Sequence, residues 1–174
     1  EFEQGIRQYS FNRLLANFSL DIDVKELVAI YHSHVPNIKI FPDAKSALET
    51  LHKKYTLGLF TDGHPETQYS KIKALNIAHF FKKITVNDLS KGITKLDPSP
   101  LTEMLRDLNA KPSETIFIGD NPLKDFKVPN NIGLDTIRII RGSGQYDPLR
   151  LDDHLPSNAK KTVATLSGIE QYFG

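Results

Sequence analysis

The sequence contains no cysteine. Disulfide bonds and thiolate chemistry are therefore excluded, and a reducing compartment is compatible with the chain. No apolar run approaches the roughly 20 residues that a membrane-spanning helix needs. Residues 1–20 also lack the form of a signal peptide, because charged side chains interrupt every apolar stretch. We therefore expect a cytoplasmic protein with no membrane partner.

An excess of charge of one sign is missing as well. The 174 residues carry 22 basic and 21 acidic side chains, for a formal net charge of +1. Nucleic acids are bound through clustered positive charge, so this balance argues against a nucleic-acid partner. Hydrophobic residues make up 39% of the chain, which is typical of a globular fold. The sequence leaves the oligomeric state open.

From about residue 40 onward, short apolar segments alternate with amphipathic segments. Strands are predicted at 55–61, 83–86, 115–118 and 136–140, with a fifth candidate at 162–166. Helices are predicted at 42–51, 66–75 and 99–109, and Ser167 with Glu170 predicts a capping box for a last helix. Such alternation is typical of right-handed βαβ crossovers. The predicted fold class is α/β, a Rossmann-like parallel sheet with helices on both faces.

The first 38 residues follow a different pattern. Residues 3–18 have apolar side chains at helical spacing, and Asp23 is placed to cap a second helix that begins near Lys25. No strand lies between these two helices. We therefore predict a small helical cap over residues 1–38 and an α/β core over residues 39–174.

Polar groups follow the predicted strands. Thr61 ends the first strand, and the backbone N–H groups of Asp62 and Gly63 follow it at the entrance to a helix, where they could hold a phosphate oxygen. The simpler interpretation is an ordinary strand-to-helix turn, in which Asp-Gly is common. His64, the next residue, could contact a substrate or simply be exposed.

Lys95 lies in a loop just before the third core helix, where a lysine could neutralise phosphoryl oxygens or keep an acidic nucleophile ionised. The alternative is that Lys95 is a solvated surface residue, as most loop lysines are. Lys91 is a nearby rival candidate for the same role.

Asp120 and Asp125 follow the strand that ends at Gly119. Two acids at the end of a parallel strand are suited to a hard divalent cation such as Mg²⁺. The alternative is a helix cap and a surface acid.

In an open α/β sheet the carboxyl ends of the strands share one edge, where ligands bind. A threonine, then a lysine, then an acid pair is also the order of motifs two, three and four in the haloacid dehalogenase-like hydrolases. Residues 119–125 (GDNPLKD) closely resemble the fourth motif, and residues 59–63 (LFTDG) resemble the second. Residues 95–100 (KLDPSP) resemble the third, although Leu96 stands where proline is commoner. Residues 42–140 match the core pattern of the family, and the first forty resemble its helical cap.

The resemblance implies a Mg²⁺-dependent phosphohydrolase that works through an aspartyl-phosphate intermediate. Thr61 would bind a phosphoryl oxygen, and Lys95 would steady the nucleophile and its charge. Asp120 would bind the metal, and Asp125 would support the metal or Lys95. The expected substrate is a small phosphorylated metabolite. Phosphonate hydrolases and phosphomutases share these motifs, whereas the dehalogenase branch does not need the acid pair.

The first motif of that family is a buried strand ending in Asp-x-Asp, which supplies the nucleophile. The one Asp-x-Asp here is residues 21–23, and it precedes a helix and not a βαβ unit. We therefore expect the nucleophile strand to lie upstream of residue 1 and this chain to have little phosphatase activity. The alternative is a non-catalytic binding or interaction module that keeps the fold.

Overall fold

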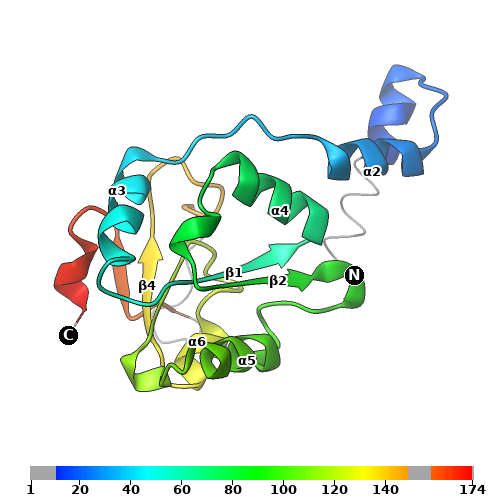
Figure 1. Cartoon of the computed structure of the whole chain (residues 1–174). Helices are drawn as coiled ribbons and strands as arrows, with labels where there is room; N and C mark the ends of the chain where they lie inside the picture. The colour runs from blue at the N-terminus through cyan, green and yellow to red at the C-terminus, as the bar shows by residue number, and fades with distance from the viewer. Residues whose placement is uncertain (1–10, 149–157, 174) are drawn as a thin grey trace.

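The structure is a computed structural model that describes residues 11–148 and 158–173 (Figure 1). Residues 11–18 are helical, as predicted, while the predicted start of that helix at residue 3 lies outside the described residues. The next helix, α2 (Val24–Ser33), begins after Asp23, whose carboxylate accepts a hydrogen bond from the backbone N–H of Lys25. The prediction that Asp23 is an N-cap is therefore confirmed.

All strand pairs of the core are parallel, which confirms the predicted α/β class. Strand β1 (Gly58–Gly63) pairs with β2 (Lys83–Asp88), and β4 (Asp135–Ile139) pairs with β3 (Ile116–Gly119) on one side and β5 (Lys161–Val163) on the other. The predicted bounds of the first strand are wrong. Strand β1 begins later and continues through Asp62 and Gly63, because these residues stay in register with Asn87 and Asp88 of β2.

The core helices are α3 (Pro42–Leu51), α4 (Pro65–Ala74), α5 (Pro98–Leu108) and the short α6 (Lys127–Asn131). The first three begin with proline, whose fixed φ suits the first turn and whose missing N–H is not needed there. The predicted last capping box is wrong. Ile169–Tyr172 is a single 3₁₀ turn that follows Gly168 without a side-chain cap, and the hydroxyl of Ser167 is hydrogen-bonded to Thr165 instead.

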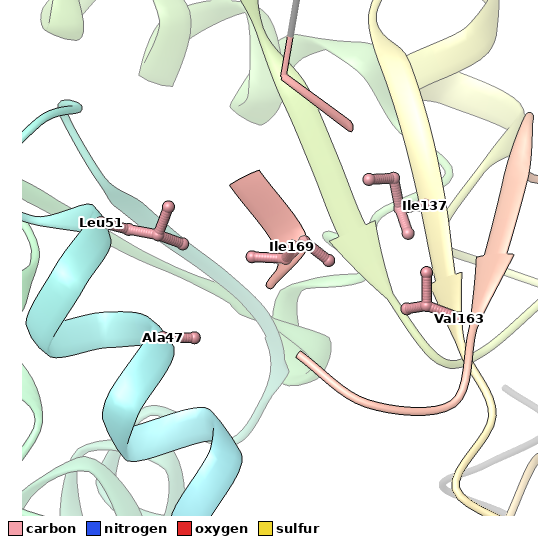
Figure 2. Close-up of a cluster of buried hydrophobic side chains, with 5 residues drawn as sticks. All are labelled: Ala47, Leu51, Ile137, Val163 and Ile169. Carbon is pink, nitrogen blue, oxygen red and sulfur yellow. The ribbon is translucent and has the colours of Figure 1, made fainter. Parts of the chain in front are cut away.

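Two hydrophobic layers cover the strands. On one face, Ala47 and Leu51 of α3 point toward Ile169 and toward the side chains of β4 and β5 (Figure 2). On the other face, α5 and α6 bury Leu101, Leu105, Val128 and Leu134. Leu57, just before β1, packs into the first layer, and Phe60 and Phe117 pack against the second. Both halves of the core therefore share the same two helical layers.

The strands nevertheless form two separate sheets. Among the described residues, no strand pairs with the second edge of β1 or of β3. The two strands approach each other through side chains, since the rings of Phe60 and Phe117 meet edge to face with centroids 6.2 Å apart. Within the described part of the chain, β1 and β3 are thus joined by side-chain contacts and not by backbone hydrogen bonds.

An extended segment, residues 34–41, connects α2 to α3 (Figure 1). Helix α2 lies near α4, and the imidazole Nδ1 of His32 is 2.9 Å from Oγ1 of Thr67. The division into a cap over residues 1–38 and a core over residues 39–174 stays a prediction. Among the helices that the structure describes, none is long and apolar enough to cross a membrane.

Candidate functional site

Thr61 lies near the carboxyl end of β1, where helix α4 begins. Gln68, in the second turn of α4, reaches back to this strand end. Its Nε2 donates to Oγ1 of Thr61 at 3.1 Å and also to the backbone carbonyl of Asp62. The helix that follows the strand therefore fixes the surroundings of the threonine hydroxyl.

The carboxylate of Asp62 connects three chain segments. Its Oδ1 accepts a hydrogen bond from Nδ2 of Asn87 at 2.8 Å, and its Oδ2 accepts one from the backbone N–H of Lys95 at 3.2 Å. Asn87 is buried next to Asp62 in the β1–β2 register. The side chain of Asp62 thus positions the loop that carries Lys95, while any direct contact of Asp62 and Gly63 with a substrate would come from their backbone.

Lys95 forms the central ion pair of the site. Its Nζ lies 2.8 Å from Oδ1 of Asp125, and the two side chains are only 17% and 2% exposed. The ammonium also lies over the ring of Phe117, 5.7 Å from the centroid. Lys95 is therefore not a solvated loop lysine. Its predicted rival Lys91 is 72% exposed and pairs with Asp88.

Asp125 is held from its other side by the main chain. Its Oδ2 accepts the backbone N–H groups of Asp120 and Asn121 at 3.0 and 2.9 Å. Gly119 makes room for it, because a Cβ at this position would overlap Oδ2, Cβ and Cγ of Asp125. The alternative that Asp125 is a surface acid is therefore wrong.

Asp120 stands at the exposed rim of the same loop. Desolvation by the surrounding protein raises the pKa of its carboxyl group, the negative charge of Asp125 adds to that effect, and Lys95 opposes it. A carboxylate in a locally anionic environment suits a cation. Mg²⁺ commonly keeps several waters and binds through one or two carboxylates, so Asp120 fits as a ligand, with Asp125 behind it. Among the described residues, no group of three or more potential metal ligands comes together.

The structure thus brings together Thr61, Asp62, Lys95, Asp120 and Asp125 at one edge of the core. It does not bring Asp21 or Asp23 into this network: both are exposed at the start of α2, where Asp23 caps the helix. Sequence reasoning missed Gln68 and Asn87. Asn87 follows the predicted strand 83–86 directly, but its pairing with Asp62 is seen only in the register of β1 with β2.

Comparison with known proteins agrees with the resemblance that the sequence motifs suggested. A family profile described as haloacid dehalogenase-like hydrolase matches residues 3–139. The chain is 30% identical over 167 residues to a glyceraldehyde 3-phosphate phosphatase of Methanopyrus kandleri, covering 90% of this chain and 71% of that protein. A phosphoserine phosphatase of Thermus thermophilus is 28% identical over 71% of this chain and 50% of its own length.

Among solved structures, the HAD hydrolase YfnB of Bacillus subtilis, bound to magnesium, superposes with a TM-score of 0.77 at 20% identity. That match covers 99% of this chain and 76% of YfnB. At this identity the similarity concerns the fold. The chain spans 61% and 56% of the length of the glyceraldehyde 3-phosphate phosphatases of Pyrococcus furiosus and Pyrococcus abyssi.

Proposed function

The chain belongs to the haloacid dehalogenase-like hydrolase family, and from this premise we propose that it is the core of a Mg²⁺-dependent hydrolase of small phosphate monoesters. The observation that carries the proposal is a network that runs from Thr61 through Gln68 to Asp62, and from Asp62 through Lys95 to Asp125. It holds a hydroxyl group, a partly buried ammonium and an acidic loop in fixed positions near the ends of successive strands. Relatives named for glyceraldehyde 3-phosphate and phosphoserine support a small metabolite as the substrate.

Each site residue has a defined role in this proposal. Thr61 and the backbone N–H groups of Asp62 and Gly63 would donate to phosphoryl oxygens. Lys95 would offset negative charge at the reacting group. Asp120 would hold Mg²⁺, and Asp125 would keep Lys95 and the loop backbone in place. When bound, the metal would supply electrostatic stabilisation of the phosphate charge.

The network among the described residues includes no carboxylate that we assign as the nucleophile. We propose that a carboxylate attacks phosphorus and expels the alcohol of the ester, which takes up a proton as it leaves. Water then cleaves the aspartyl-phosphate, which releases inorganic phosphate and restores the carboxylate. This carboxylate would belong to a strand lying between β1 and β3. Paired parallel strands lie about 4.8 Å apart, and a strand in this position would bond to the edges of β1 and β3 that pair with no other described strand. Its carboxyl end would lie between Thr61 and Asp120. Asp21 and Asp23 are not suited to this role, because Asp23 caps α2.

The test is hydrolysis of a generic aryl phosphate with Mg²⁺. We would compare the 174-residue chain with a version extended upstream by about 20 native codons, which is enough for one strand and a turn. Activity in the extended version alone, abolished by Asp120→Asn, would support the proposal. Robust activity of the shorter chain would contradict the location of the nucleophile.

The second candidate is a non-catalytic module that keeps the fold. It is favoured by one observation: within the described part of the chain, the one Asp-x-Asp sequence lies at the start of α2 and not in the core. Mg²⁺ binding without turnover in both versions would decide for this candidate. The predicted cytoplasmic location has no bearing on either outcome and stays a prediction.

A further inference from the structure

We propose that Gln68 is a positioning residue that makes the hydroxyl of Thr61 a committed hydrogen-bond donor to a phosphoryl oxygen. The inference rests on the proposed function and deepens it. Gln68 is in α4 and would not itself touch the substrate. It would act by deciding which way the Thr61 proton points.

The orientation of the Gln68 amide follows from its partners. One terminal atom of the side chain contacts both Oγ1 of Thr61 and the backbone carbonyl of Asp62. A carbonyl oxygen can only accept a hydrogen bond, so the atom that faces it must be the amide nitrogen. That nitrogen carries two hydrogens, and each has one acceptor here. Oγ1 of Thr61 is therefore the acceptor in its contact with Gln68.

A threonine hydroxyl has a single proton and two lone pairs. Because Gln68 occupies a lone pair of Oγ1, the proton must point to another partner. Thr61 lies near the carboxyl end of β1, the same edge as Lys95 and Asp120. An anionic oxygen bound there would receive this proton without first reorienting the hydroxyl, which is the advantage of a preorganised donor.

Gly63 provides the space for this arrangement. A Cβ on Gly63 would lie 2.5 Å from Nε2 of Gln68 and 2.8 Å from its Cγ. The φ of Gly63 is +156°, a value that residues with a side chain rarely adopt. The glycine of the Thr61-Asp62-Gly63 segment therefore serves the glutamine as well as the turn of the backbone.

The test measures binding of inorganic phosphate in the presence of Mg²⁺ by titration calorimetry. The variants are Gln68→Met, which keeps the volume but removes the donor, Thr61→Val, and the double variant. Tyr69→Phe, at an exposed position of the same helix, is the control. Gln68→Glu is a second probe of the same site, because a carboxylate would accept the Thr61 proton and reverse the hydrogen bond. Thermal unfolding of each variant reports whether the fold is retained.

We expect Gln68→Met to weaken phosphate binding about tenfold, the size of effect expected for one hydrogen bond to a charged group. Thr61→Val should have a similar effect, and the double variant should bind no more weakly than Thr61→Val alone, because both changes remove one interaction. Gln68→Glu should bind more weakly than Gln68→Met. Tyr69→Phe should bind like the unmodified chain.

The outcomes separate this inference from the proposed function. If the unmodified chain binds phosphate and Gln68→Met binds equally well, the inference is wrong and the proposed phosphate site stands. Additive losses in the double variant would also overturn it, since Gln68 would then act independently of Thr61. If the unmodified chain does not bind phosphate, both the site and the inference fail.

Discussion

His32 of α2 and His64, which precedes α4, stack on each other with ring centroids 4.1 Å apart and an interplanar angle of 28°. His64 follows Gly63 directly, so this contact places α2 beside the segment that holds Thr61. Nδ1 of His32 is also 2.9 Å from Oγ1 of Thr67 in α4. Helix α2 is therefore attached to the core beside the end of β1 that carries Thr61.

We predict that His32→Ala loosens α2 while the core keeps its stability. Amide hydrogen exchange in residues 24–33 should become faster, because the stacking on His64 and the hydrogen bond to Thr67 are lost. Exchange in β1 and β4 should not change, because these strands do not depend on either contact. Thr67→Val is the matched control, since it removes the hydrogen bond and keeps the rings stacked. It should give an intermediate effect. Unchanged exchange in α2 of His32→Ala would show that other contacts attach this helix.

Removal of the Lys95 ammonium should lower the free energy of unfolding. In Lys95→Met, Asp125 stays buried and loses the counter-charge on Oδ1, and breaking a buried ion pair typically costs about 3–5 kcal/mol. We expect the free energy of unfolding in urea to fall by about 3 kcal/mol. Lys91→Met, at the exposed rival position, should change it by less than about 0.5 kcal/mol. Equal effects of the two variants would contradict the assignment of Lys95 as the buried partner.

A methyl group at residue 119 should displace Asp125. Gly119→Ala introduces a Cβ that overlaps the carboxylate of Asp125, so we expect a loss of about 1–3 kcal/mol in the free energy of unfolding. The same substitution in an Asp125→Gly background should cost much less, because all three overlapping atoms are gone. The comparison of the two backgrounds is the measurement. An equal cost in both would show that the backbone at Gly119, and not Asp125, resists the methyl group.

Asp43 should make stability depend on acid pH. Its carboxylate accepts hydrogen bonds from the backbone N–H of Leu166, from Arg141 and from Thr165, at 2.9, 2.8 and 3.0 Å. Burial alone would raise the pKa of Asp43, but these hydrogen bonds, helped by the charge of Arg141, lower it from 3.8 to about 2. The folded-state pKa lies below the unfolded one, so the stabilisation is present above pH 4 or so and is lost as the pH falls toward about 2.

The measurement is the difference in unfolding free energy between the unmodified chain and Asp43→Asn across this range. The difference should be at most about 2 kcal/mol near neutral pH and should shrink on acidification. Arg141→Met, which removes one of the donors, should reduce the pH dependence without abolishing it. A difference that is the same at every pH would exclude ionised Asp43 as its source.

The fold class could be predicted because the apolar segments of the core have strand length and alternate with helical patterns. The first and last residues of β1 could not be predicted in this way. Tyr55 has the composition of a strand residue, yet its N–H bonds to the carbonyl of Leu51 and continues the turn after α3. Asp62-Gly63 has the composition of a turn, yet pairing with β2 extends the strand through both residues. Pairing with β2 thus overrode local preference at the carboxyl end of β1, and a local hydrogen bond in the turn after α3 did so at the other end.

Candidate site residues with charge could be identified from the sequence, since Lys95, Asp120 and Asp125 stand out at strand ends. Gln68 and Asn87 could not be selected in the same way. An amide on a helix or strand is ordinary in composition, and its role depends on which group it faces across the fold. Only the packing of α4 on β1, and the register of β1 with β2, gives these amides their partners.

The absence of a described ladder between β1 and β3 has a consequence for cooperativity. In a continuous sheet, backbone hydrogen bonds couple the unfolding of neighbouring strands. Here the β1–β2 sheet and the β3–β4–β5 sheet are coupled by the shared helical layers, the Phe60–Phe117 contact and the Lys95–Asp125 ion pair. We expect such a chain to open in two steps, with β1 and β2 released while β3, β4 and β5 stay folded. A segment that binds between β1 and β3 would then do more than complete the sheet: it would make two folding units behave as one.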